Sequence, residues 1–337
     1  MGSKTKTGVV VIGRNEGDRL IRSLESIGKG VQGIVYVDSG STDGSCEAAR
    51  DRGVEVINLD MAIPFTAARA RNAGFERLRE IHPGIEYVQF IDGDCEVVNG
   101  WIEAAAEVLD THPDIVAVCG WRQERYPERS VYNRICDVEW HIGEIGEIHA
   151  FGGDVMIRAS ALAAVGAYNP SVIAAEDDEL AVRLRQKGGK ILRIDQTSTL
   201  HDADMHHLAQ WWNRAKRCGY AYSQVSSLHG TSPDRKFVKE VRRTWLWGFF
   251  MPLGAMILAP FTYGLSLILF LRYPLTALRT IYSTHRRGFT WAESIPWGLS
   301  CSVSVFPEAL GAVKFQLNRL RNRQHEIIEY KGPQASV

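Results

Sequence analysis

The sequence lacks the cysteine patterns and targeting signals that assign many proteins to a class. Its six cysteines are scattered singly and form no Cys-x-x-Cys pair, which argues against a zinc ribbon and against a disulfide framework. The N-terminal residues lead almost directly into a strand-like segment without a secretory signal, and Lys6 breaks the myristoylation pattern. We therefore expect reduced thiols and a cytosolic environment.

Neither sign of charge is in excess, because the 337 residues include 39 Lys plus Arg and 39 Asp plus Glu. This balance gives no indication of nucleic acid or of an acidic polymer as a partner, so any electrostatic function must be local. A Gly-x-Gly-x-x-Gly string follows none of the strand-like runs, which removes the main support for a dinucleotide-binding fold. The length predicts about two units, and 45% hydrophobic with 23% charged residues is ordinary for a globular protein.

Short apolar runs alternate with amphipathic segments over residues 8–95. Four runs are typical of buried strands, GVVVIG, GIVYVDSG, VEVINLD and IEYVQFID, and helical patterns lie between them. This alternation predicts an α/β fold with a mainly parallel, doubly wound sheet. Ligands of such sheets bind at the carboxyl ends of the strands. Because Asp38, Asp92 and the GRNE loop at residues 13–16 follow three of the strands, we expect them to meet at one edge.

The stretch FIDGDCEV, residues 90–97, places Asp92, Asp94 and Glu96 two residues apart at the end of the fourth strand. One interpretation is a solvated turn, since Asp-Gly is a common turn dipeptide. The other is a site for Mg²⁺ or Mn²⁺, which carboxylate oxygens hold together with substrate phosphates. His201, in STLHDAD, is then a candidate third ligand and Glu96 a candidate outer ligand.

Four consecutive acids, Glu176, Asp177, Asp178 and Glu179, begin a predicted helix. Acids in a first helical turn favour the positive end of the helix dipole, which is one sufficient reason for their presence. Four in a row exceed what capping requires, and their mutual repulsion raises at least one pKa. A carboxylate tuned in this way and placed near a hydroxyl is a reasonable general base.

Arg214 and Arg217 lie three residues apart on a later predicted helix. Side chains at this spacing point the same way, so they are candidates for binding donor phosphate oxygens. A solvated helix face is the alternative interpretation. Trp211 and Trp212 precede them and suit stacking on a sugar, core packing or a membrane interface.

Residues 245–271 contain no charged side chain, and basic residues flank them on both sides. The segment is long enough to cross a bilayer as one helix, but its prolines and glycines argue against a straight rod. Positive charge at both ends favours a re-entrant hairpin or an interfacial helix pair on the cytoplasmic side. The alternative is a buried helical hairpin of a soluble domain.

Taken in order, six segments and one later histidine resemble family 2 of the inverting glycosyltransferases, which have the GT-A fold. They are VVVIGRNEG, VYVDSGSTDGS, ARARNAGF, FIDGDCEV, FGGDVMIRASALAAVGAYN, AAEDDELAVRLRQKGGKI and the later His201. The resemblance covers about residues 8–225. It implies a GT-A catalytic domain at residues 1–232, with a nucleotide-sugar half at about 8–115 and an acceptor half at about 116–232. Residues 233–337 are expected to form a helical, membrane-associated region.

The resemblance also implies roles for individual residues. Together with the strand ends, it places donor binding at Gly13, Arg14, Glu16, Asp38, Arg71 and Asp92. Asp94 and His201 would hold the metal, and Asp177 would be the catalytic base. Glu176 and Asp178 would lie on the acceptor side. Ser39 stands where the family more often has a second aspartate, which weakens the expected base contact.

The expected function is metal-dependent, inverting transfer of one sugar, with a UDP-sugar as donor and Mg²⁺ or Mn²⁺ as cofactor. A single transfer is favoured because the Gln-x-x-Arg-Trp element of processive synthases is absent. The expected acceptor is a glycan or a lipid-linked, cell-surface polysaccharide intermediate at the cytoplasmic face of the inner membrane. Two alternatives stay open, a sugar nucleotidyltransferase and a nucleotide-sugar-binding scaffold without catalysis.

Overall fold

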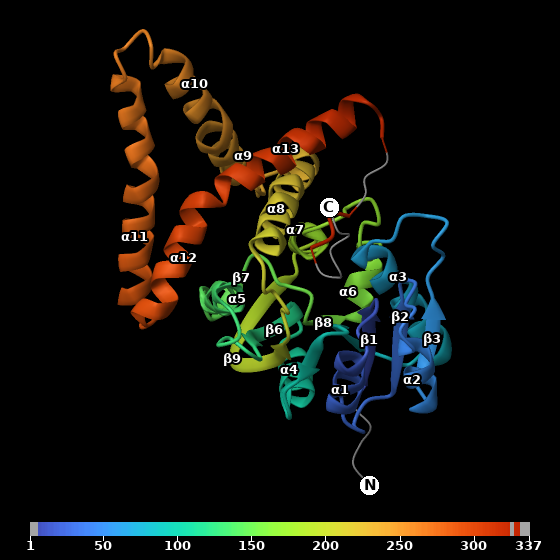
Figure 1. The fold of residues 1–337 in the computed structure, drawn as a ribbon. Helices are drawn as coiled ribbons and strands as arrows, with labels where there is room; N and C mark the ends of the chain where they lie inside the picture. Colours follow the sequence, from blue (N-terminus) through green and yellow to red (C-terminus); the bar gives the residue numbers. More distant parts are fainter. Residues whose placement is uncertain (1–5, 324–326, 331–337) are drawn as a thin grey trace. The chain divides into compact units, whose positions relative to one another are not determined.

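The computed structural model describes residues 6–323 and 327–330. Packing divides the chain into two compact units. Figure 1 shows the fold with colours that follow the residue number. The sheet unit comprises Met1–Arg125 and Trp140–Ala203, and the helical unit comprises Tyr126–Glu139 and Asp204–Val337. Residues 204–232 thus group with the C-terminal helices, while the domain boundary expected near residue 232 stays a prediction.

One mixed sheet forms the sheet unit, in the order β3-β2-β1-β4-β8-β6-β9-β5 with β7 paired to β9. The strands are β1 (Thr7–Gly13), β2 (Gly33–Asp38), β3 (Glu55–Asn58), β4 (Tyr87–Asp92), β5 (Cys95–Val97), β6 (Ile115–Glu124), β7 (Gly146–Ile148), β8 (Val155–Arg158) and β9 (Lys190–His201). Strands β1 to β4 are parallel, as predicted. Strand β8 lies antiparallel between β4 and β6, and β5 and β7 pair antiparallel with β9. Strands β6 and β9 are again parallel, so the sheet is mixed rather than mainly parallel.

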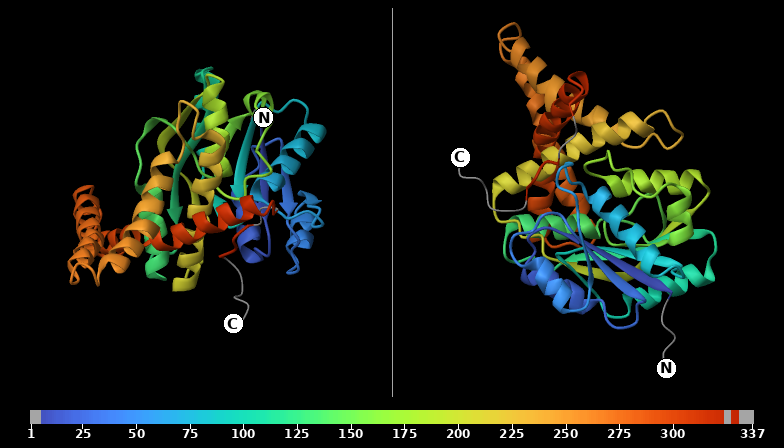
Figure 2. Two further views of the ribbon diagram at one scale, coloured as in Figure 1. Left: turned by 90° about the horizontal axis from the view of Figure 1, so that it is seen from above. Right: turned by 90° about the vertical axis from the view of Figure 1, so that its right-hand side faces the viewer.

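Both faces of the sheet are buried, since alternate side chains of one strand enter two separate apolar clusters. Val10 and Ile12 belong to one buried cluster and Val9 and Val11 to another. The first cluster includes side chains of α3 (Ala67–Ile81), α6 (Ala159–Ala164) and α7 (Glu176–Gln186), and the second includes those of α1 (Asp18–Ser26), α2 (Ser45–Asp51) and α4 (Trp101–Thr111). Helices therefore cover both faces, which explains the nearly continuous apolar runs of the parallel strands (Figure 2).

The helical unit is built from α-helices joined by short irregular segments. Its elements are α8 (Leu208–His229), α9 (Val238–Trp245), η1 (Leu246–Phe250), α10 (Met251–Leu258), η2 (Leu265–Leu271), α11 (Arg272–Arg286), α12 (Trp291–Val303) and α13 (Val305–Leu320), and most of α5 (Val131–His141) also belongs to it. Helices α8 and α13 cross closely at Gly219 and Gly311, where a Cβ atom on either glycine would overlap the backbone of the other helix. Glycine is required at both positions.

The uncharged segment at residues 245–271 is interrupted, as its prolines and glycines predict. A π-helical turn η1 leads into α10, a turn with Gly264 at φ 84° follows, and the 3-10 helix η2 continues into α11. No described helix has the length and the apolar character that crossing a membrane requires.

Candidate functional site

The carboxyl ends of β1, β2 and β4 meet at one edge of the sheet, as the sequence predicts. In the strand register Gly13 lies opposite Asp38, and Ile12 lies opposite Asp92. A Cβ on Gly93 would lie 3.2 Å from the Glu16 side chain, so the turn after β4 packs directly against the loop after β1. The expected donor-side residues of these loops are therefore neighbours.

The Asp38 side chain stabilises the turn after β2 by accepting hydrogen bonds from its neighbours in the chain. Its Oδ1 accepts a hydrogen bond from the Tyr36 hydroxyl at 2.9 Å, and its Oδ2 accepts from the amides of Gly40 and Ser41 at 2.9 and 2.8 Å. A cavity of about 340 Å³ opens beside this turn, lined by residues that include Asp38, Ser41, Cys46 and Asn58. Burial and the nearby carboxylate raise the pKa of Tyr36, so its hydroxyl stays a donor.

The loops after β1 and β2 are bonded to each other through Asn15. Its amide donates to Ser41 Oγ at 2.8 Å, and its side-chain oxygen accepts from the Thr42 amide at 2.8 Å. Asn15 has a φ of 55°, a conformation that asparagine tolerates better than most residues. Beside it, the Arg14 guanidinium lies 4.9 Å from the centre of the Phe65 ring, and Glu16 pairs with Arg19 at 2.9 Å.

Arg71, on α3, joins three carboxylates at the centre of the site. Its guanidinium lies 2.9 Å from Asp92 Oδ1, 2.5 Å from Glu176 Oε1 and 3.5 Å from Asp177 Oδ1, and the residue is 2% exposed. Burial lowers the pKa of Arg71, but the surrounding carboxylates raise it well above its usual range. Burial raises the pKa of Asp177 well above its ordinary value, against the opposing charge of Arg71. Asp178 follows on the same helical turn, partly buried.

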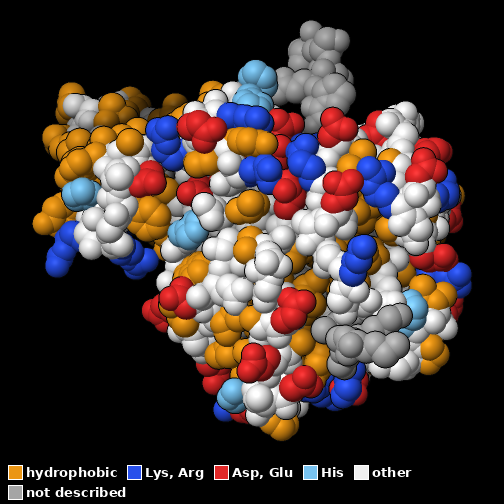
Figure 3. All heavy atoms as spheres, turned by 90° about the horizontal axis from the view of Figure 1, so that it is seen from below, with side chains coloured by type: hydrophobic (Ala, Val, Ile, Leu, Met, Phe, Trp, Pro, Cys, Tyr) orange, Lys and Arg blue, Asp and Glu red, His pale blue; other side chains and the backbone are white. Residues whose placement is uncertain are grey.

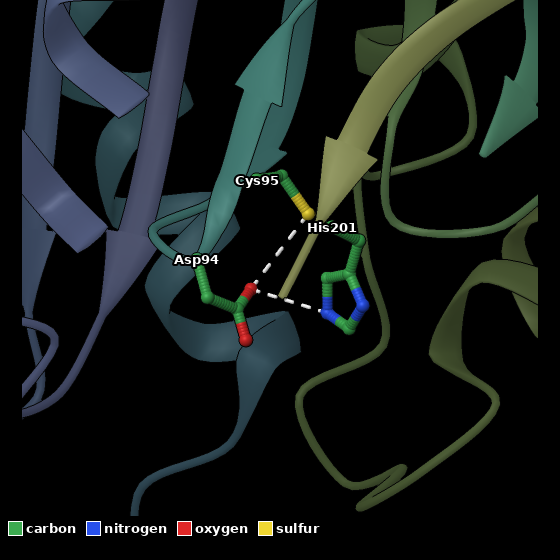
Figure 4. Close-up of side chains that lie close together, drawn as sticks. All are labelled: Asp94, Cys95 and His201. Carbon is green, nitrogen blue, oxygen red and sulfur yellow. Dashed lines mark hydrogen bonds and ion pairs between the residues drawn. The ribbon is translucent and has the colours of Figure 1, made fainter. Parts of the chain in front are cut away.

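Asp94 and His201 are brought together by the pairing of β5 with β9. Asp94 Oδ1 lies 3.3 Å from His201 Nε2, both side chains are nearly fully buried, and the Asp202 amide donates to the Asp94 carbonyl at 3.1 Å. Ligand atoms that share one Mg²⁺ or Mn²⁺ ion at about 2.1 Å lie about 3 Å apart. The two side chains therefore fit a small divalent cation. Figure 4 shows that Cys95 also faces this carboxylate oxygen, with Sγ at 3.7 Å.

Glu96 is directed elsewhere, which corrects its expectation as an outer metal ligand. Its two carboxylate oxygens lie 3.1 Å from Arg22 Nε and 2.5 Å from an Arg125 guanidinium nitrogen. Both of its oxygens are therefore engaged by arginines. Since alternate residues of a strand point to opposite faces, Cys95 rather than Glu96 shares a face with His201.

Sequence reasoning missed a second arginine, partly buried, beside Asp92. Arg122 Nε donates to Asp154 Oδ2 at 2.6 Å, and another guanidinium nitrogen lies 3.5 Å from Asp92 Oδ2. Thr199 also donates to Asp154 Oδ2, at 2.6 Å. Burial raises the pKa of Asp154, but Arg122 and Thr199 outweigh it and hold that pKa below its ordinary value. The glycine pair before Asp154 was the only sequence signal for this part of the site.

The expected phosphate ligands Arg214 and Arg217 lie in the helical unit. Arg214 forms a bidentate ion pair with Glu139 at 2.7 and 3.2 Å, and Arg217 lies 5.7 Å from the centre of the Tyr330 ring. Arg214 is thus not a solvated arginine of an exposed helix face. Donor binding by the two arginines stays a prediction.

The mixed sheet, with its acidic strand ends at one edge, has the fold of the GT-A glycosyltransferases. A mannosyltransferase, PcManGT from Pyrobaculum calidifontis, solved with GDP-Man and Mn²⁺, is 17% identical with a TM-score of 0.62, and the match covers 93% of this chain and 88% of that one. A structure of residues 1–349 of S. aureus TarS is 14% identical with a TM-score of 0.52, covering 88% and 90%. At these identities the likeness shows the fold.

Residues 8–166 match glycosyl transferase family 2, and this part of the chain is a family 2 glycosyltransferase domain. Its curated relatives include the succinoglycan biosynthesis protein ExoA of Rhizobium meliloti (strain 1021), which is 27% identical over 179 residues. That match covers 50% of this chain and 53% of the relative, so the chain spans about half the length of ExoA.

Proposed function

We propose that this glycosyltransferase moves one sugar from a nucleotide-diphosphate sugar to a hydroxyl acceptor, with inversion and with Mg²⁺ or Mn²⁺ as cofactor. The observation that carries the proposal is the arrangement of buried acids at one sheet edge. Asp94 is paired with His201, while Asp177 is held beside Arg71 and Asp92. One group thus suits a cation and the other suits a proton transfer.

Asp177 is the proposed catalytic base. Its pKa is raised by burial, which makes it a better proton acceptor than a solvated carboxylate. It takes the proton of the acceptor hydroxyl as that oxygen attacks the anomeric carbon, and the bond from that carbon to the nucleoside diphosphate breaks. A single displacement of this kind inverts the anomeric configuration. Glu176 and Asp178 flank the base on the acceptor side in this proposal.

Asp94 and His201 are the proposed metal ligands. A divalent cation held there would stabilise the negative charge that grows on the leaving diphosphate. Arg71 orients Asp92 toward the donor, where Asp92 is proposed to meet the ribose. The remaining proposed donor contacts are Gly13, Arg14, Glu16, Asp38, Arg214 and Arg217.

A UDP-sugar is the proposed donor and a glycan or lipid-linked intermediate the proposed acceptor. Support for a nucleotide sugar comes from the cavity beside Asp38 and from the GDP-Man of the mannosyltransferase neighbour. Because that neighbour holds a guanine nucleotide, a donor panel must include GDP-sugars. Support for the acceptor class comes from ExoA, which is a succinoglycan biosynthesis protein.

We also propose that the helical unit lies on the cytoplasmic face of the inner membrane. Large apolar side chains over residues 246–282 are exposed, including Phe261 at 78%, Tyr263 at 99% and Leu265 at 68%. Figure 3 shows hydrophobic side chains gathered at its left-hand side, in the part of the molecule that carries α11 and α12, with basic side chains at the edge. Exposed apolar surface rimmed by Arg and Lys is typical of interfacial membrane binding.

Donor hydrolysis in the presence of Mn²⁺ or Mg²⁺ tests the catalytic part of the proposal. We expect the intact chain to hydrolyse one member of a panel of UDP- and GDP-sugars, and Asp94→Ala to abolish the metal-dependent rate. Asp114→Asn is the matched control, since its exposed carboxylate pairs only with Lys190 at the surface among the described residues. Equal rates for wild type and Asp94→Ala would refute the assignment, and donor binding without hydrolysis or transfer would indicate a scaffold.

Fractionation of cells that express the intact chain tests the membrane proposal. We expect the protein in the membrane pellet and its release by detergent. Recovery of the whole chain in the soluble fraction at low and high salt would contradict interfacial binding. This result would leave the catalytic proposal intact.

A further inference from the structure

We propose that Asp94, Cys95 and His201 form a thiophilic metal site, where Zn²⁺ binds in place of the hard cation and inhibits the enzyme. The site is built from the sheet unit alone. Only the inhibition rests on the proposed function, because metal binding itself requires no activity.

The backbone places Cys95 and His201 together. The two residues are directly opposite in the antiparallel register of β5 and β9, so their side chains emerge on the same face of the sheet. Asp94 precedes β5 in the turn after β4, and its carboxylate turns back toward the pair. Figure 4 shows the cysteine sulfur and the histidine ring facing the same oxygen of Asp94.

The distances fit tetrahedral coordination. Bonds of about 2.0 Å from zinc to oxygen and nitrogen, and about 2.3 Å to sulfur, give tetrahedron edges of about 3.3 Å from O to N and about 3.5 Å from O to S. The corresponding distances are 3.3 Å from Asp94 Oδ1 to His201 Nε2 and 3.7 Å from Asp94 Oδ1 to Cys95 Sγ. The ligand atoms of all three side chains lie within 4.8 Å of one another.

The donor set and its surroundings favour a soft or borderline ion. Thiolate and imidazole bind Zn²⁺ far better than Mg²⁺, and Zn²⁺ exceeds Mn²⁺ in affinity for most nitrogen and sulfur ligands. A second carboxylate is close, since Asp154 forms a compact group with Cys95 and Asp92 and is 5% exposed. Asp154 Oδ1 is buried without a hydrogen-bond partner in the part of the chain that the structure describes. A second carboxylate therefore lies beside the cysteine ligand.

Binding requires one chemical change. The Cys95 thiol gives up its proton to solvent as the sulfur to zinc bond forms, while the neutral imidazole and the ionised carboxylate donate lone pairs directly. The thiol plays no such part with Mg²⁺ or Mn²⁺, which prefer oxygen. Cys95 thus distinguishes zinc from the activating ions.

Cobalt provides the direct readout, since Co²⁺ occupies zinc-type sites and a thiolate ligand produces a near-ultraviolet charge-transfer band. We expect this band when Co²⁺ is added to the intact chain, and its loss when Zn²⁺ displaces the cobalt. Cys95→Ser and Cys95→Ala should lack the band, and Cys301→Ser, altered in the helical unit, should retain it. Far-ultraviolet circular dichroism establishes that each variant is folded.

Inhibition of donor hydrolysis by Zn²⁺ in the presence of Mn²⁺ provides the second readout. Removal of one ligand should raise the inhibitory zinc concentration at least about tenfold in Cys95→Ser. Wild-type protein that shows no thiolate band, or a band that persists in both Cys95 variants, overturns the proposal. Manganese-dependent activity without the cobalt thiolate band refutes only this inference. The band without any donor hydrolysis or transfer refutes only the proposed function.

Discussion

Replacement of Arg71 by glutamine should be the most destabilising single change in the candidate site. Arg71 is 2% exposed and lies within 3.5 Å of Asp92, Glu176 and Asp177. Glutamine retains hydrogen-bonding capacity but leaves three carboxylates without their central cation. Removal of one partner of a buried ion pair costs about 3–5 kcal/mol, because the other charge stays buried and unpaired.

The expected shift in melting temperature follows from the size of the folding unit. One kcal/mol corresponds to about 2–4 °C in a domain of about 150–250 residues, so Arg71→Gln should melt about 6–20 °C below wild type. The loss should be smaller in the double variant Arg71→Gln/Glu176→Gln, because one of the orphaned charges is removed as well. Calorimetry or thermal circular dichroism near pH 7 measures both.

Arg79→Gln is the matched control, on the same helix but with an exposed side chain stacked 5.5 Å from the Phe75 ring centre. Such a surface change should stay within about 0.5 kcal/mol of wild type. If Arg71→Gln melted together with Arg79→Gln, the three carboxylates would not depend on the arginine. The reasoning about the buried network would then be refuted.

Three further outcomes follow from the structure. Asp177→Asn should lower the rate of sugar transfer at least about 10²-fold. Burial raises the pKa of Asp177 in the folded state, so ionisation of this carboxyl costs stability at pH 7. Asp177→Asn should therefore be more stable than wild type at pH 7. That gain should vanish as the pH falls below about 3.9, the unfolded-state value, and chemical denaturation over pH 3–7 measures it. Gly153→Ala places a Cβ 2.6 Å from Nη2 of Arg71 and should reduce kcat about 10²-fold. The Cβ of Gly152→Ala meets nothing within 4 Å, so this variant should keep the wild-type kcat. Leu265→Asp should weaken vesicle co-sedimentation about tenfold, while Leu320→Asp, at a similarly exposed leucine on α13, should leave it unchanged; equal binding by both would contradict insertion of this segment.

Much of the first half of the fold could be predicted from local pattern. The period of the apolar residues and the turn residues between them predict strands and helices over residues 8–95, and the rule for parallel sheets places their carboxyl ends together. The observed register, with Gly13 opposite Asp38 and Ile12 opposite Asp92, confirms this. The prolines and glycines of residues 245–271 likewise predicted an interrupted segment. These features depend on interactions between residues close in the chain.

The second half of the sheet could not be predicted in this way. The antiparallel entry of β8 between β4 and β6 reverses part of the expected parallel sheet. An isolated strand pattern carries no information about its neighbours or direction, because either pairing satisfies the same backbone groups. The position of Asp154 beside Arg122 follows from that choice.

The sequence by itself determined which polar residues stand at the strand ends, because a strand's length and the turn after it are local properties. Only the tertiary structure decided how those residues share charge. Arg71 reaches Asp92 across 21 residues and Glu176 across 105, and the pairing of β5 with β9 places Cys95, rather than Glu96, beside His201. Contacts at such separations are selected by the packing of the whole unit, where each buried charge must find a partner that no local pattern specifies.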